Sequence, residues 1–349
     1  MSFSELDVDR RTKKPHFLYQ IDQLIDWHMI DIAIKQYYKP EPVIIGRPAY
    51  SGLLLFKMLL VGIWHGGLSD EAVEDMANAN LHVMRFLKLS LEENVPDHSV
   101  LSRFRSKLSH SKAWDTLLQS VNTQVNQYGF MLTQGVHVDA SLTPSQRKPR
   151  SKPTYEVSPD RSDVDDETAA SQAMDMVSVE ESGVDTEARY TVKQGKAVFG
   201  YKQNTLVNDH GLVDAVVTTP ANVHDSISFP ELLEKSTVEE GVRVNTDKAY
   251  ASKKHDDLLR SKQLKNGIQQ KAVRGKPLTK LQKRRNKLIS KRRYVVERTF
   301  GSQALWFGGK TMRYVGQVKA HAWHVLQGMA YHLKRLVGLI NRQLQDQSA

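Results

Sequence analysis

Apolar and polar residues alternate with a helical period along the first third of the chain. Apolar positions recur at helical spacing up to about Gln127, with glycine or proline between the runs. We predict helices over residues 50–64, 69–77, 81–87 and 99–108. Ser69 and Asp97 can begin two of them, since their side-chain oxygens accept hydrogen bonds from amides of a first helical turn. Residues 1–128 are therefore predicted to form a helical N-terminal domain.

The period changes to that of strands from Gly129 onward. The segments GVHVDASL, VFGYKQNTLVN and LVDAVVTT are predicted strands, and Asp209-His210-Gly211 marks a hairpin between the last two. There follow a helix over residues 225–235, the strand VRVNT, a helix over 255–260, the strand GIQQ and a long basic helix ending near Leu305. Three strands followed by alternating helices and strands predict a mixed α/β domain over residues 129–349, with helices covering a mixed sheet.

The helix over residues 99–108 has two distinct faces. Its apolar residues share one face, and basic residues such as Arg103 fall outside it. This pattern fits a DNA-recognition helix of the helix-turn-helix type as well as it fits ordinary packing. We take Arg103 and Arg105 as candidate DNA contacts.

Charge is unevenly distributed along the chain. The net charge is +10, yet residues 156–187 hold eleven acids against Arg161 alone, so the rest of the chain carries +20. Such an excess suits a polyanionic partner, because Lys and Arg contacts to phosphates release counterions, although simple solubility is the alternative. The acidic segment has no sustained period, which predicts a disordered insertion. Removal of residues 160–181 should therefore leave folding intact.

Several classes of protein lose support from what the sequence lacks. Without cysteine there is no disulfide and no cysteine-bound zinc, which fits a reducing compartment. The opening residues do not resemble a signal peptide, and the most apolar run, residues 51–64, is too short for a bilayer. Motifs of P-loop ATPases, zinc proteases and serine hydrolases are absent. We expect a cytoplasmic protein without membrane contact.

Three acidic residues stand where the pattern does not explain them. Asp139 lies within a predicted strand, and Asp247 directly follows another. Glu297 is the only acid within residues 271–313, among fourteen Lys or Arg residues. Each has a simpler interpretation: a turn residue, a helix cap, and a helical pair with Arg293 worth at most about 0.5 kcal/mol. One shared site would explain all three together.

Three clustered carboxylates are typical of a site for divalent metal ions. Carboxylate oxygens are hard ligands that suit Mg²⁺ or Mn²⁺ better than zinc. Two such ions roughly 4 Å apart assist an in-line displacement at phosphorus. The sequence therefore predicts metal-dependent phosphoryl transfer, with Asp139, Asp247 and Glu297 as metal ligands and catalytic residues.

Other residues near these acids have plainer interpretations. His224 and Asp225 could act as a general base pair, but Asp225 is better interpreted as a helix cap. His137 lies two residues before the first acid and is better interpreted as a packed histidine than as a ligand. Trp306 and Phe307 could stack on an unpaired base, yet core packing is the favoured interpretation.

Several short motifs occur together in a specific order. The segments HVDAS, FGYK, ANVHDS, NTDKAY and RRYVVERTFG resemble insertion-sequence transposases with a DDE core, specifically the insertion-sequence five family. The segments GRPAYSGLLLFKMLLVGIWHGGLSDEAVEDM and PDHSVLSRFR extend the resemblance to the amino end. It implies an RNase H-like, retroviral integrase-like catalytic core with a helical N-terminal domain. It also implies a metal triad on Asp139, Asp247 and Glu297, with Arg293 as a phosphate contact.

The resemblance also directs attention to other basic residues. Further candidate DNA contacts are Arg292, Arg298, Lys248 and Lys202. The chain departs from the family at three positions, where Ala304 replaces a frequent lysine, Ala249 a glycine and Ser290 a tyrosine. These departures concern local DNA contacts and leave the metal site whole.

The resemblance implies a DNA transposase. Such an enzyme binds the terminal inverted repeats of its own element, hydrolyses a phosphodiester to free a 3′-hydroxyl, and joins that hydroxyl to target DNA. Magnesium is the implied cofactor, with manganese as a substitute, and a homodimer or larger assembly on double-stranded DNA is implied because two ends must be held together. Two alternatives stay open: a nuclease of the same fold without strand transfer, and a non-catalytic DNA-binding protein derived from a transposase.

Overall fold

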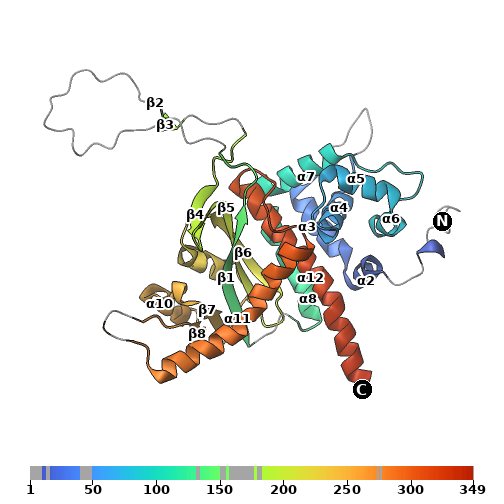
Figure 1. Cartoon of the computed structure of the whole chain (residues 1–349). Helices are drawn as coiled ribbons and strands as arrows, with labels where there is room; N and C mark the ends of the chain where they lie inside the picture. Colours follow the sequence, from blue (N-terminus) through green and yellow to red (C-terminus); the bar gives the residue numbers. More distant parts are fainter. Residues whose placement is uncertain are drawn as a thin grey trace.

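A mixed sheet and a group of helices lie side by side, with a long C-terminal helix between them (Figure 1). The computed structural model describes residues 10–12, 16–39, 49–130, 134–149, 155–156, 177–178, 183–272, 275 and 277–348. Of the acidic segment predicted as an insertion, residues 156, 177–178 and 183–187 are among these described residues. The predicted deletion over residues 160–181 falls outside them except at 177–178.

The sheet has the strand order of an RNase H-like fold. Its spatial order is β4 (Arg189–Lys193), β5 (Lys196–Asn208), β1 (Gly135–Pro144), β7 (Arg243–Thr246) and β8 (Lys265–Ile268), with β6 (Val213–Pro220) also paired to β5. Strand β5 is antiparallel to β1, β4 and β6, whereas β7 is parallel to both β1 and β8. The order β6-β5-β1-β7-β8 confirms the fold class that the resemblance implied. Two further strands, β2 (Tyr155–Glu156) and β3 (Val177–Ser178), pair only with each other among the described strands.

From β5 onward the elements follow the predicted order, whereas β2, β3 and β4 were not predicted. Strand β5 ends at Asn208 and β6 begins at Val213, and Gly211 between them has a φ of +84°, which glycine adopts without strain. The later helices are α9 (Phe229–Lys235), α10 (Lys253–Ser261) and α11 (Lys280–Trp306). Helix α11 packs against β1, β5 and β7, and so reaches the strands that carry the predicted acids.

The described N-terminal part is helical, as predicted. Its helices are α2 (Phe17–Leu24), α3 (Trp27–Tyr37), α4 (Gly52–Trp64), α5 (Asp70–Ala79), α6 (Leu81–Leu87), α7 (His98–His110) and α8 (Ala113–Gln127). Helices α4 to α7 match the predicted ranges to within a few residues. Ser69 caps α5 and Asp97 caps α7, where their side chains accept the amides of Ala72 and Ser99. Helices α2, α3 and α8 were not among the predicted ranges.

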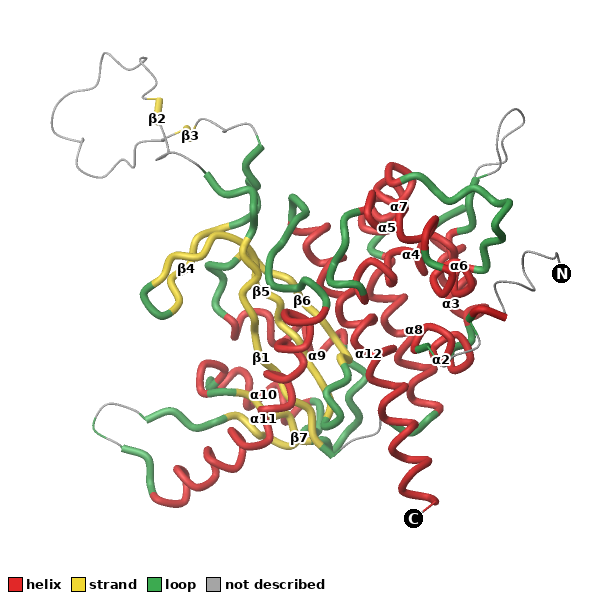
Figure 2. The backbone as a smooth tube through the Cα atoms, turned by 45° about the vertical axis from the view of Figure 1, so that its right-hand side comes forward, coloured by secondary structure: helices red, strands yellow, loops and turns green. Residues whose placement is uncertain are grey.

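Helix α12 (Gln317–Ser348), which no prediction covered, joins the two parts of the molecule. It packs against α2, α4, α7 and α8 and also against β5 and β6. Figure 2 shows it between the sheet and the N-terminal helices. The Trp64 indole of α4 donates a hydrogen bond to the Ala330 carbonyl of α12 at 2.9 Å. One apolar core therefore extends from Leu18 to Leu339, and a smaller one lies between the sheet and helices α9 and α10. The division after residue 128 stays a prediction, and the larger core is shared across it.

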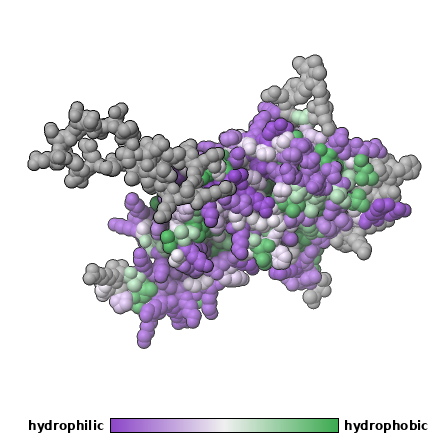
Figure 3. Space-filling model, turned by 45° about the horizontal axis from the view of Figure 1, so that its top comes forward, coloured by the Kyte–Doolittle hydropathy of each residue, from purple (hydrophilic) through white to green (hydrophobic). Residues whose placement is uncertain are grey.

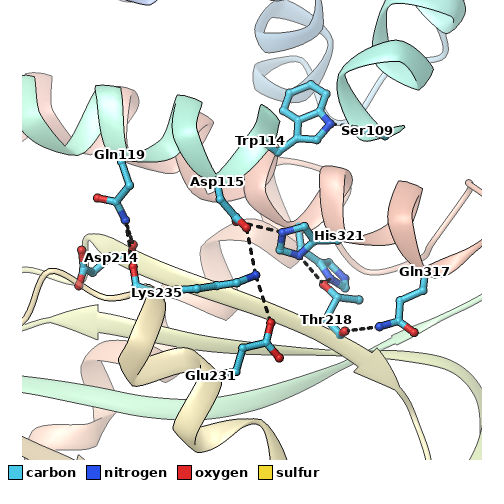
Figure 4. Close-up of polar contacts among 11 residues, drawn as sticks. Ser109, Trp114, Asp115, Gln119, Asp214, Thr218, Glu231, Lys235, Gln317 and His321 are labelled. Atoms are coloured by element: carbon cyan, nitrogen blue, oxygen red, sulfur yellow. Dashed lines mark hydrogen bonds and ion pairs between the residues drawn. The ribbon is translucent and has the colours of Figure 1, made fainter. Parts of the chain in front are cut away.

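A polar network connects α8, α9, β6 and α12 beside the larger core (Figure 4). Asp115 of α8 lies 3.0 Å from His321 Nε2 and 3.0 Å from Lys235 Nζ. Thr218 of β6 contacts His321 at 3.3 Å and the buried His324 at 2.7 Å. Buried polar groups are costly unless they are hydrogen-bonded, so these contacts fix α12 in one position on the sheet.

Most of the visible surface is hydrophilic, with small apolar patches (Figure 3). No helix in the described part of the chain is long and apolar enough to cross a membrane. Large apolar side chains are nevertheless exposed at the end of α11, where Leu305 is 74% and Trp306 60% exposed.

Candidate active site

Asp139 and Asp247 come from neighbouring parallel strands. Strands β1 and β7 are in register up to His137 and Asn245, and each acid follows two residues later. Parallel strands bring equivalent positions to the same edge of a sheet, so the two acids lie near each other. The two acids interact electrostatically, because the negative charge of Asp247 contributes to raising the pKa of Asp139.

Asp139 is a largely buried carboxylate held by an arginine from α11. Its Oδ2 lies 2.7 Å from Arg293 Nη2, and its Oδ1 accepts the Ala140 amide at 2.9 Å. Side-chain exposure is 22% for Asp139 and 11% for Arg293. Burial raises the pKa of Asp139, and Arg293 opposes this shift without reversing it. The single guanidinium therefore does not fully compensate the buried negative charge.

Asp247 begins a short 3₁₀ turn directly after β7. Its Oδ1 accepts the Ala249 amide at 2.8 Å, so the simpler interpretation of Asp247 as a cap is confirmed. The cap occupies one carboxylate oxygen. The other oxygen is not used by the cap, so capping and metal binding are compatible.

Glu297 lies one helical turn after Arg293 on α11 and is exposed. It forms no ion pair in the described chain, and Arg293 pairs with Asp139 instead. The simpler interpretation of Glu297 as a helical partner of Arg293 is therefore wrong.

The three predicted acids are not gathered into a closed cluster in this structure. Within the described residues, one group of three acidic or histidine side chains has ligand atoms within 4.8 Å of one another, and it consists of Glu74, Asp97 and His98. The assignment of Asp139, Asp247 and Glu297 as a triad stays a prediction.

Tyr250 lies close enough to Asp139, Asp247 and Asp225 for all three charges to act on it. Tyr250 is 1% exposed, and its hydroxyl has no hydrogen-bond partner among the described residues. Burial and the nearby charges of Asp225 and the paired acids raise the pKa of Tyr250. Lys202 Nζ lies 2.7 Å from Asp225 Oδ1 and donates to the Val223 carbonyl at 2.7 Å. Asp225 is thus an ion-pair partner, and the cap of the turn that it begins is His224.

These contacts change the interpretation of Lys202. Its side chain is 14% exposed and committed to Asp225, so it is not a free DNA contact. The resemblance named Lys202 as a DNA contact, but the sequence could not show that the segment after β6 returns to pair with it. The sequence did not single out Tyr250, because a tyrosine three residues after an acid belongs to no motif that indicates a function.

Arg105 is likewise not available to DNA. It is 5% exposed, donates two hydrogen bonds to Asp70 at 2.8 and 2.7 Å, and lies 4.3 Å from the centre of the Tyr314 ring. Arg105 lies on the buried side of α7, which α5 and the segment before α12 cover. Arg103, two residues earlier, is exposed.

The other basic candidates differ in exposure. Arg292 and Lys248 are exposed, as a DNA contact requires. Arg298 is partly buried and donates to the His210 carbonyl at 3.1 Å. Their contacts with DNA stay predictions.

The plainer interpretations of the aromatic residues are confirmed in two cases and wrong in one. His137 is fully buried and lies 2.9 Å from Asp209 through Nε2, as a packed histidine does. Phe307 is 2% exposed and belongs to the core. Trp306 is 60% exposed, so the interpretation of this residue as a core residue is wrong.

Known proteins resemble this chain over most of its length. Residues 6–107 match a family described as a transposase domain, and residues 146–333 match the transposase DDE domain. The second match contains Asp247 and Glu297 and begins after Asp139. The transposase for insertion sequence element IS1106 of Neisseria meningitidis serogroup B is 31% identical over 242 residues, which are 66% of this chain and 75% of that protein. A cryo-EM structure of the piggyBac transposase synaptic complex with hairpin DNA covers 94% of this chain and 74% of its own, with 9% identity and a TM-score of 0.43.

The RNase H-like sheet carries Asp139 within β1 and Asp247 directly after the adjacent β7, an arrangement that suits metal-assisted phosphoryl transfer. The DDE-domain match covers more than half of the chain. The chain belongs to the transposases with a DDE domain, and it is a DNA transposase of the insertion-sequence type. Membership in this family implies dependence on a divalent metal ion.

Proposed function

We propose that this transposase binds the terminal inverted repeats of its own element, cleaves one strand to free a 3′-hydroxyl, and joins that hydroxyl to target DNA. Asp139, Asp247 and Glu297 would hold Mg²⁺, which Mn²⁺ could replace. The observation that carries the proposal is the nearness of Asp139, within β1, to Asp247, directly after the adjacent parallel β7, with Arg293 of α11 placed against Asp139.

The residues at this place fit a hard divalent cation. Carboxylates are the oxygen ligands that Mg²⁺ prefers in proteins. Burial and Asp247 raise the pKa of Asp139 even though Arg293 is 2.7 Å away, so additional positive charge would be favourable here. A bound divalent ion supplies electrostatic stabilisation of the charge that develops at the attacking and leaving oxygens.

The chain's own residues would position the DNA. Arg293 holds α11 against β1 through Asp139, so its guanidinium would contact a phosphate through the nitrogen atoms that Asp139 does not bind. Glu297 is exposed and unpaired within the described chain, so its side chain can turn toward the acids without breaking an ion pair. The exposed Arg292, Lys248 and Arg103 would contact the DNA backbone at other points.

We further propose that the protein acts as a homodimer or larger assembly on DNA. Joining both ends of one element requires that two DNA ends be held together, and a symmetric dimer provides two equivalent sites. Sedimentation of the protein with and without end-bearing DNA would measure this.

The proposal is tested by replacing each acid in the full chain. D139N, D247N and E297Q should each lower cleavage and joining by roughly 100-fold or more, since several kcal/mol of stabilisation are lost. Binding of the same DNA should persist. Asp257 is a matched control, because it is an exposed acid on α10 that pairs only with Arg260 at 3.0 Å in the described structure. D257N should cleave as the unaltered protein does.

The products distinguish the proposal from its alternatives. End-bearing DNA, a target plasmid and Mg²⁺ should give both cleaved and joined products. Cleavage without any joined product would identify a nuclease and contradict strand transfer. Cleavage that D247N leaves unchanged would remove Asp247 from the site. Binding of the DNA without any cleavage by the unaltered protein would indicate a DNA-binding protein.

A further inference from the structure

Gly301 is an exposed glycine inside the long helix α11. Its backbone is helical, and its φ is not among the positive values found at other glycines of the described chain. Inside a helix glycine is less favourable than every residue except proline, because it loses the most backbone freedom on folding. The helix itself therefore gains nothing from glycine at this position.

Packing within the described chain does not require glycine there either. A Cβ at Gly301 would meet no atom of the described chain within 4 Å, whereas a Cβ at Gly308 would lie 2.5 Å from a backbone oxygen. Tyr294 and Leu305 share a face of α11 with Gly301, since they lie seven residues before it and four after it. They are 56% and 74% exposed, so this face of the helix is open.

Gly301 lies one helical turn beyond Glu297. Residues four apart share a face of a helix and are separated by about 6 Å along its axis. One turn before Glu297, Arg293 contacts Asp139 at 2.7 Å, so this side of α11 borders the predicted site. Side chains of a helix lean back toward its N-terminus, so a side chain at position 301 would cover the turn that carries Glu297. Glycine leaves that turn uncovered.

The charge of α11 changes near the same turn. The helix holds nine Lys or Arg residues over 280–298 and no charged residue over 299–306. Long basic side chains contact phosphates at a distance from the helix, whereas a turn without a side chain lets a ligand approach the backbone closely. The major groove alone is about 12 Å wide, so DNA bound at Glu297 also covers a residue one turn away.

We propose that Gly301 gives the DNA strand that is to be cut the room to lie against α11 beside Glu297. The inference rests on the proposed place of Glu297 in the active site. Gly301 supplies no chemistry of its own. Its role is to keep side-chain atoms out of the position that the strand occupies.

The test compares side chains of increasing size at position 301 in the full chain. G301A and G301L should each raise the urea midpoint by about 0.3 M, because alanine and leucine favour a helix over glycine. Extra atoms forced into a close contact correspond to about 5- to 150-fold in affinity. G301L should weaken binding of end-bearing DNA by about that factor, measured together with D247N to prevent cutting, and G301A should weaken it less.

Cleavage provides a second measurement in the protein with all three acids intact. The DNA concentration that gives half-maximal cleavage should rise in G301L by a similar factor. The Mg²⁺ concentration that gives half-maximal cleavage should stay unchanged, because the added side chain meets DNA and not the metal ligands. Stability and activity should therefore change in opposite directions, which a merely structural glycine would not show.

Gly338 of α12 is a matched control. It is also exposed inside a long helix, and a Cβ there would likewise meet no atom of the described chain within 4 Å. Helix α12 carries none of the predicted site residues. G338A and G338L should raise the urea midpoint as the substitutions of Gly301 do, and should leave DNA binding and cleavage within about twofold of the parent.

Three results would overturn the role of Gly301. The first is unchanged DNA binding by G301L; a loss of cleavage alone would mean that the added side chain hinders Glu297 and not the DNA. The second is a lower urea midpoint for G301A, which would show that the position is packed. The third is an equal loss of binding in G338L.

Failure of the proposed function would appear separately. Cleavage by E297Q at the rate of the unaltered protein would remove Glu297 from the site, whatever the substitutions of Gly301 do. An inactive E297Q together with a G301L that binds and cleaves DNA normally would remove the role of Gly301 alone.

Discussion

Arg105 provides a direct test of the difference between a structural arginine and a DNA contact. It joins α7 to Asp70 at the start of α5 and to Tyr314 in the segment before α12. Burial disfavours the charge of Arg105, yet the hydrogen bonds and charge of Asp70 raise its pKa overall. The substitution R105A would leave Asp70 in a partly buried place without its counter-ion.

The expected loss of stability follows from the burial of the pair. Removing one partner of a buried ion pair costs about 3–5 kcal/mol, because the remaining charge is not compensated. The Asp70 side chain is 22% exposed, so water partly screens it and the lower end of that range applies. A loss of about 3 kcal/mol is a large part of the 5–15 kcal/mol that typically stabilises a folded domain.

Urea unfolding followed by circular dichroism measures this loss. With a slope of about 3 kcal/mol per molar urea, the midpoint should fall by about 1 M. R103A is the matched control, since Arg103 is exposed on the same helix, and its midpoint should be unchanged. If Arg103 contacts a phosphate, R103A should instead weaken DNA binding and reduce its salt dependence by about one counterion. An unchanged midpoint for R105A with weaker DNA binding would refute the structural role.

Three further substitutions test the packing. Burial acts to raise the pKa of Asp115, but His321 and Lys235 outweigh burial, so the pKa is lowered. The stabilisation that ionised Asp115 gives the folded state is therefore present above the unfolded pKa of about 4, and it is lost as the pH falls through the lower folded pKa. D115N should therefore cost no more than about 1 kcal/mol at pH 7, with a difference that shrinks toward pH 3, and a constant difference would contradict this role. Y250F removes a buried hydroxyl without a described partner and should leave stability equal or raise it by up to about 2 kcal/mol, whereas a lower urea midpoint would show that the hydroxyl is bonded. Gly308 has a φ of +66°, and a Cβ there would lie 2.5 Å from the Gly66 carbonyl oxygen, so G308A should lower the urea midpoint by an amount equivalent to about 1–3 kcal/mol. An unchanged midpoint for G308A would contradict that close approach.

The sequence by itself determined the order of the elements and the place of two acids on them. Alternation with period two and the turn at Gly211 predict β1, β5 and β6, because backbone geometry alone sets which residues share a face. Ser69 and Asp97 predict helix starts that the structure confirms, since capping depends on amides only two or three residues away. The same pattern puts Asp139 within β1 and Asp247 directly after β7, where the structure has them.

Only the tertiary structure decided which side chains meet. The partners of Arg105 and Lys202 lie on other elements, so a helical or strand pattern cannot distinguish a buried ion pair from a DNA contact. Trp306 and Phe307 are adjacent in sequence and equally apolar in pattern, yet one is exposed and the other buried because of where α12 crosses the end of α11. The sequence pattern reflects local geometry, whereas burial, ion pairing and the shape of a pocket depend on contacts between distant segments. That is why the chemistry of the acids could be predicted, and the ion pairs of Arg105 and Lys202 could not.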